Sequence, residues 1–102
     1  MVHPSRNPRR TTDEIENAVK LVAELCTQHG IDRQKSRALM NLTRWVGRKK
    51  EPPTLTQLER RFGPWGVNVL LPFLMHNGIV GASDGWRDGK PVMELDYGKE
   101  ES

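Results

Sequence analysis

The sequence of 102 residues has a single cysteine, Cys26, and no long run of apolar residues. One cysteine cannot form a disulfide within the chain or supply a cysteine metal cluster, and we expect Cys26 to be a small core residue on a helix. A membrane span needs about 18 consecutive apolar residues, which this sequence lacks. Residues 1–10 have no apolar stretch of the kind found in signal peptides. These absences predict a cytoplasmic protein.

Residue combinations that enzymes use are also missing. The sequence shows no paired carboxylates in a plausible pocket, no nucleophile with an accompanying base and no glycine-rich phosphate loop. Its three histidines, His3, His29 and His76, are far apart and lack the spacing of metal ligands. We therefore expect no enzymatic activity, no metal, no cofactor and no small-molecule substrate.

Apolar residues make up only 35% of the chain, so a domain of this size has little apolar surface to leave outside its core. The length fits one domain. We assign residues 11–97 to this domain, residues 1–10 to a disordered basic arm and residues 98–102 to a disordered acidic tail.

The arm has two prolines, three arginines and few apolar side chains, so nothing in it can be buried. Two interpretations stay open. The arm is a solvated tail, or it lies along a phosphate backbone or in a minor groove and contacts DNA through Arg6, Arg9 and Arg10.

The formal net charge is +3 and the isoelectric point is about 9.4, values that permit a nucleic-acid partner without requiring one. Basic side chains gather in the arm, at the end of the second predicted helix, on the third, and around a predicted turn near the C-terminus. Outside the arm these residues are Arg44, Arg48, Lys49, Lys50, Arg60, Arg61, Arg87 and Lys90.

Two long amphipathic helices are predicted in the first half of the domain. The first starts at Thr11 or Thr12 and is closed by Gly30, and the second starts after Asp32 and runs to about Arg48. Each places apolar residues three and four positions apart, which gives one buried face. These faces contain Ile15, Ala18, Val19, Val22, Leu25 and Cys26, and then Ala38, Leu39, Leu42, Trp45 and Val46.

A third helix begins at Thr54, which forms a capping box with Gln57. Its expected buried edge consists of Leu55, Leu58 and Phe62. Gly63 then allows a sharp turn, because a residue without a side chain adopts positive φ at no steric cost.

A fourth helix starts at Pro64, where the missing N–H is tolerated, and runs to Asn77 with Gly78 as its C-cap. Pro72 lies inside this helix and should kink it, because it removes one backbone hydrogen bond. Strands at residues 79–82 and 91–96 follow, joined by turns at Asp84-Gly85 and Asp88-Gly89.

The helix TLTQLERRF, the turn at Gly63, the helix ending LMHNGIV and the segment SDGWRDGKPVMEL follow one another in the order of a winged helix-turn-helix. Residues 36–96 resemble that superfamily. The spacing from Gly63 to residues 78–80 is similar to the DNA-reading gamma domain of bacterial chromosome translocases and to small bacterial and phage regulators. The resemblance implies a mainly α protein with a C-terminal β-hairpin, a winged helix-turn-helix preceded by two long N-terminal helices.

The resemblance further implies a small DNA-binding protein, a transcriptional regulator or an accessory DNA-binding factor, whose fourth helix enters a major groove of double-stranded DNA. Its buried face would carry Val67, Leu70, Leu71 and Leu74. Trp86 either contacts DNA or folds back on the domain. The expected DNA-binding residues are Thr56, Gln57, Arg60, Arg61, Trp65, Asn68, Trp86, Arg87 and Lys90.

The fourth helix also supports an alternative, because it has no charged side chain between Pro64 and Met75. Its apolar residues Trp65, Val69, Pro72 and Phe73 would form an exposed patch unless the first two helices cover them, and such patches mark interfaces. On this hypothesis the chain is a protein-interaction module that docks a protein partner or forms a homodimer.

Overall fold

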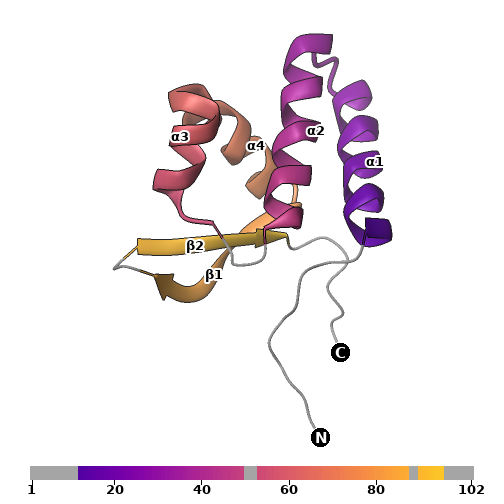
Figure 1. Cartoon of the computed structure of the whole chain (residues 1–102). Helices are drawn as coiled ribbons and strands as arrows, with labels where there is room; N and C mark the ends of the chain where they lie inside the picture. The colour runs from indigo at the N-terminus through magenta and orange to yellow at the C-terminus, as the bar shows by residue number, and fades with distance from the viewer. Residues whose placement is uncertain (1–11, 50–52, 88–89, 96–102) are drawn as a thin grey trace, which may run out of the picture.

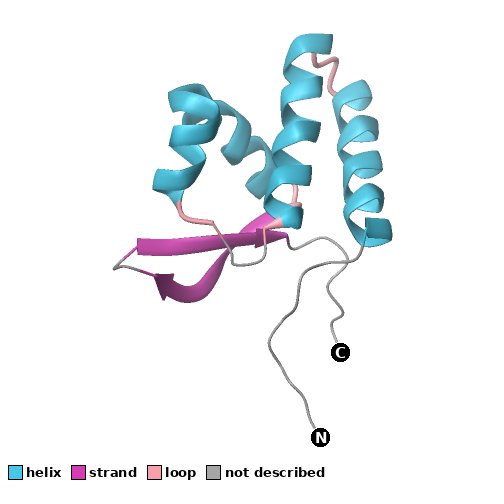
Figure 2. Ribbon diagram, viewed as in Figure 1, coloured by secondary structure: helices cyan, strands magenta, loops and turns pink. Residues whose placement is uncertain are grey.

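The computed structural model describes residues 12–49, 53–87 and 90–95, with the backbone alone described for residues 82–87 and 90–95. Helices α1 (Thr12–Gln28) and α2 (Arg33–Arg48) lie side by side (Figure 1). The N-terminal arm with Arg6, Arg9 and Arg10 and the tail 98–102 lie outside the described residues, as does the capping role expected of Thr11. The prediction of a mainly helical chain is confirmed (Figure 2).

The two long helices begin and end where the sequence predicts. Asp32 is the N-cap of α2, and its Oδ1 accepts a hydrogen bond of 2.8 Å from the Lys35 N–H. After α1, Gly30 adopts φ of 66°. The Ile31 N–H then reaches back to the carbonyl of Cys26 at 2.9 Å, which pairs a carbonyl that the helix end would leave free.

Helix α3 (Leu55–Trp65) begins at the predicted capping box. The Gln57 N–H donates to Thr54 Oγ1 at 3.2 Å, and the Thr54 N–H donates to Gln57 Oε1 at 3.0 Å. The turn predicted at Gly63 is confirmed, because this residue has φ of 78° inside an otherwise helical segment. Leu58 is fully buried, but the expectation for Leu55 is wrong, since Leu55 is 39% exposed. Helix side chains lean toward the N-terminus, so the Leu55 side chain points past the start of α3.

The kink predicted at Pro72 takes the form of a π-helical turn, η1 (Gly66–Leu70), followed by α4 (Leu71–His76). The Leu71 N–H bonds to the Gly66 carbonyl five residues earlier. Pro72 lies at the start of α4, where its lack of an N–H costs least. Helix α4 ends at His76, one residue before the predicted Asn77.

Strands β1 (Val80–Arg87) and β2 (Lys90–Leu95) pair antiparallel and cross one end of the helices (Figure 1). The turn predicted at Asp84-Gly85 is wrong, because β1 continues through it. Residues 83–85 of β1 lie opposite residue 92 of β2 alone, so an irregularity in the pairing absorbs the extra residues. The turn predicted at Asp88-Gly89 lies outside the described residues.

One apolar core joins all four helices and the start of β1. Gly78 has φ of 74° and turns the chain out of α4. Ile79 and Val80, which follow it, are buried in the core. Val67, expected in the core, is only half-buried against it. None of the described helices combines the length and hydrophobicity needed to cross a membrane. The core contains Ile15, Ala18, Val19, Val22, Cys26, Leu39, Leu42, Val46, Leu58, Leu70, Leu71, Leu74, Ile79 and Val80.

Candidate functional site

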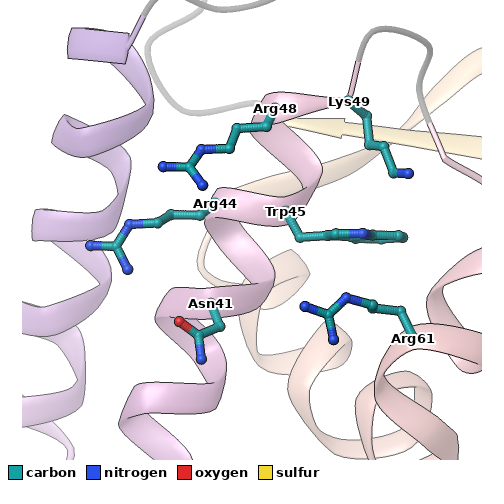
Figure 3. Close-up of a pocket in the computed structure, with 6 residues that line it drawn as sticks. All are labelled: Asn41, Arg44, Trp45, Arg48, Lys49 and Arg61. Atoms are coloured by element: carbon teal, nitrogen blue, oxygen red, sulfur yellow. The ribbon is translucent and has the colours of Figure 1, made fainter.

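A concavity of about 390 Å³ lies between the last turns of α2 and helix α3. Four of the six residues that line it are cationic, and none is acidic. Figure 3 shows Trp45 at its centre, with Lys49 and Arg61 on either side of the indole ring. The lining residues are Asn41, Arg44, Trp45, Arg48, Lys49 and Arg61. We call this surface the basic concavity.

Helical spacing explains why α2 and its C-cap Lys49 supply five of these six residues. Residues four positions apart share a helix face, which aligns Arg44 with Arg48 and aligns Trp45 with both Asn41 and Lys49. The opposite face of α2 is fixed against the core by its buried leucines and Val46. The polar face of the helix is therefore held toward solvent, with Trp45 and Lys49 on the α3 side and Arg44 and Arg48 extending toward α1 (Figure 3).

Trp45 is half-buried, and its ring is held by neighbours from α2 and α3. The rings of Trp45 and Phe62 pack T-shaped, with centroids 5.6 Å apart and an interplanar angle of 79°. The Lys49 ammonium lies 5.1 Å from the centre of the Trp45 ring, a cation–π contact. The Arg61 guanidinium lies 5.1 Å from the Phe62 ring. Aromatic side chains thus hold two cations at the walls of the concavity.

Arg44 is the one cation of the concavity with an ion pair among the described residues. Its Nε and Nη2 donate to the two carboxylate oxygens of Glu16 on α1, at 3.1 and 3.3 Å. This hydrogen bonding lowers the pKa of Glu16 below its ordinary value, and the charges of Arg44 and Arg48 add to the effect. Arg48, Lys49 and Arg61 have no such carboxylate partner in the part of the chain that the structure describes.

The DNA contacts predicted on α3 lie in different surroundings. Arg61 lines the basic concavity, whereas Thr56 and Arg60 are exposed outside it. Gln57 is committed to the capping box at the start of the helix. Of these predicted residues, only Arg61 lies in the basic concavity. The other cations there, Arg44, Arg48 and Lys49, were not predicted as site residues.

The apolar face predicted on the fourth helix is only partly open. Trp65 is 43% exposed, and Asn68 and Pro72 are exposed as well. Val69 and Phe73 are half-buried, and Phe73 packs T-shaped against His29 with ring centroids 5.8 Å apart. The N-terminal helices thus cover only the flank of this face.

The structure describes only the backbone of the predicted site residues on the two strands. Arg87 is paired with Lys90, and Trp86 is paired with Pro91. These pairs lie at the end of the sheet farthest from the pairing of Val80 with Leu95. Both interpretations of Trp86 stay predictions.

Sequence reasoning missed Trp45 and Asn41 as site residues. Trp45 fits the apolar stripe of α2, so periodicity assigns it to the core. The cluster of Arg44, Arg48 and Lys49 was visible, and their spacing along one helix was the available signal. The sequence does not reveal that α3 would bring Arg61 to the same place.

Comparisons with family models, with curated proteins and with solved structures found no match to this chain. No group of three or more His, Cys, Asp or Glu side chains among the described residues is arranged to hold a metal ion. The chemistry of the site therefore has to be inferred from the basic concavity and the neighbouring surfaces.

Proposed function

We propose that this chain is a small DNA-binding protein, a transcriptional regulator or accessory factor, built on a winged helix-turn-helix. The order of its elements supports this fold: α2, α3, a tight turn at Gly63, the η1–α4 segment and two antiparallel strands. In such a domain the segment from Pro64 to His76, which spans the end of α3, η1 and α4, would be the reading helix and the two strands the wing. A fold of this kind does not determine a function by itself, so the proposal depends on the surface.

The observation that carries the proposal is the gathering of Arg44, Arg48, Lys49 and Arg61 in one concavity without a carboxylate in its lining. Arg44 is paired with Glu16, but Arg48, Lys49 and Arg61 have no carboxylate partner among the described residues, so their charges attract an anion to the concavity. Phosphate groups of nucleic acid supply that anion and provide most of the affinity of DNA-binding proteins. The nearby pairing of Arg44 with Glu16 leaves at least three cations for such contacts.

The other predicted contacts extend this surface in the proposal. Thr56 and Arg60 are exposed on α3, the helix that supplies Arg61. Asn68 is exposed on η1, where an amide side chain can pair with adenine in a major groove. Trp86, Arg87 and Lys90 of the strands and the arm residues remain proposed contacts with the duplex.

A triple variant tests the proposed surface. Replacing Arg48, Lys49 and Arg61 with glutamine removes three cations from the concavity. Because each phosphate contact contributes about 0.9 to the slope of log affinity against log salt, we expect weaker duplex binding and a slope lower by about 2 to 3. The measurement is fluorescence anisotropy with a random-sequence duplex across a salt series.

The matched control removes the same total charge elsewhere. Lys20, Arg33 and Arg37 are exposed on α1 and α2 and do not line the concavity. Replacing these three with glutamine should lower the salt slope much less. Equal effects of the two triple variants would show that net charge alone drives binding and would remove the concavity from the proposal.

A second function is favoured by one observation, the exposure of Trp65 and Met75, each 43%, beside the exposed Pro72. We propose that this face, formed by the end of α3, η1 and α4, mediates self-association. A twofold dimer would bury these side chains together and still present two basic concavities. Light scattering should then show a dimer in the native chain and a monomer in Trp65→Ala. A native chain that stays monomeric at high concentration would contradict this proposal.

A further inference from the structure

We propose that the basic concavity binds single-stranded DNA, with one unpaired base stacked on Trp45 and the adjoining phosphates held by Arg48, Lys49 and Arg61. The proposal rests on the proposed function, because it assumes that the concavity contacts nucleic acid. It names a form of nucleic acid that the winged-helix resemblance does not imply.

Trp45 is half-buried against the core, and cationic side chains lie on both sides of its ring (Figure 3). Lys49 lies over the ring at 5.1 Å, and Figure 3 shows Arg61 on the opposite side. The T-shaped contact with Phe62 fixes the plane of the ring at one flank. Long cationic side chains can swing away and still reach a phosphate, which leaves a ring face for a base. Such stacking on aromatic rings within a basic groove is how proteins hold unpaired strands.

The concave shape favours an unpaired base over a base pair. A space of about 390 Å³ between two helices is within the usual range of pockets for small organic groups. In a duplex the ring faces of the bases are stacked on one another, so only their edges are open to protein. A side chain recessed between α2 and α3 cannot reach those stacked faces. An unpaired base can enter and place its own face against the indole.

The distribution of charge favours a strand over a free nucleotide. Lys49 and Arg61 flank the ring, whereas Arg44 and Arg48 project from the other side of α2 toward α1 (Figure 3). The two groups of cations therefore face different neighbours, α3 and α1 (Figure 3). A strand that crosses the last turns of α2 can place successive phosphates against each group. Asn41, exposed at the rim, adds an amide able to bond to a base edge.

Substitutions of Trp45 test the stacking without changing any charge. In Trp45→Leu the affinity for a short oligothymidine should fall about tenfold, within the range found when stacking residues are removed. The salt slope should stay the same, since no phosphate contact is lost. Trp45→Phe keeps an aromatic face and should retain most of the affinity. Thermal melting of both variants establishes that they remain folded.

A spectroscopic readout locates the base independently of affinity. The indole N–H signal of Trp45 is assigned by its absence in Trp45→Phe. Stacking of a base on the ring should move this signal upfield during titration with oligothymidine, through the ring current of the base. Duplex DNA of matched length should shift the signal less, because its bases are already stacked on one another. The mononucleotide dTMP should shift it only at much higher concentration.

The outcomes separate this inference from the proposed function. If both Trp45 variants bind oligothymidine as tightly as the native chain, the stacking is overturned, while a weakened duplex affinity of the triple variant still supports DNA binding. If dTMP binds as tightly as the oligonucleotide, the site takes a free nucleotide and the strand is overturned. If the native chain binds neither single-stranded nor duplex DNA at low salt, both proposals fail together.

Discussion

Gly66 determines how closely the η1–α4 segment approaches α3. A Cβ atom at this position would lie 2.5 Å from the Cβ of Phe62, a contact that real Cβ atoms do not make. Phe62 in turn packs against Trp45, so this glycine supports one wall of the basic concavity. The sequence shows Gly66 only as a glycine inside a helical segment, and the partner that makes it necessary becomes visible in three dimensions.

Replacing Gly66 with alanine should destabilise the fold. Overpacking of a close contact costs about 1–3 kcal/mol, which exceeds the roughly 0.5–1 kcal/mol that alanine gains over glycine in a helix. The Cβ of Phe62 is bonded directly to the backbone, so no rotation of the side chain moves it away. Urea unfolding should therefore show a lower midpoint in Gly66→Ala. A midpoint equal to or above that of the native chain would show that the two helices can separate at little cost.

Glu16 and Arg44 predict a dependence on pH at the edge of the concavity. Because Arg44 lowers the folded-state pKa of Glu16, the stabilising contribution is present above the unfolded pKa and is lost as the pH falls through the folded pKa. Carboxyl NMR titration should find the Glu16 midpoint below its ordinary value in the native chain. In Arg44→Gln the midpoint should rise toward that value. An unchanged midpoint would mean that the ion pair is not maintained in solution.

At the scale of elements, the beginnings and ends of helices were the most predictable features. The N-cap of Asp32, the capping box at Thr54 and the glycines that close α1 and α4 all depend on local backbone chemistry, which the sequence contains. The π-helical turn before Pro72 and the irregular pairing of β1 were not predicted in form. Both depend on how a segment packs against its neighbours, and local sequence does not encode that.

The capping box of α3 predicts a measurable contribution to stability. Thr54 is buried, and its hydroxyl accepts the Gln57 N–H. Removing an N-cap hydroxyl costs about 0.5–2 kcal/mol, so Thr54→Ala should unfold at a lower urea concentration than the native chain. Thr54→Ser keeps the hydroxyl and should lose much less. If serine and alanine were equally destabilising, the lost methyl group rather than the cap would account for the effect.

In the whole molecule, the core and the clusters of charged residues were predictable from the sequence. That the cations at the end of α2 and Arg61 of α3 would line one concavity was not. Periodicity placed Leu39, Leu42 and Val46 inside α2, and all three are buried. The same periodicity assigned Trp45 to the core, and the structure places it half-buried against the core while it also lines the basic concavity. Contact between α2 and α3 produces this surface, and it is set by the tertiary packing of residues far apart in the chain.

The most direct test of the central claim is a map of amide chemical-shift changes as the ¹⁵N-labelled chain is titrated with DNA at low salt. The largest changes should fall at Asn41, Trp45, Arg48, Lys49 and Arg61, the residues around the basic concavity. Changes confined to Trp65, Asn68 and their neighbours on η1 and α4 would place binding on the apolar face. No change at any residue, with either duplex or single-stranded DNA, would contradict the claim that this chain binds DNA.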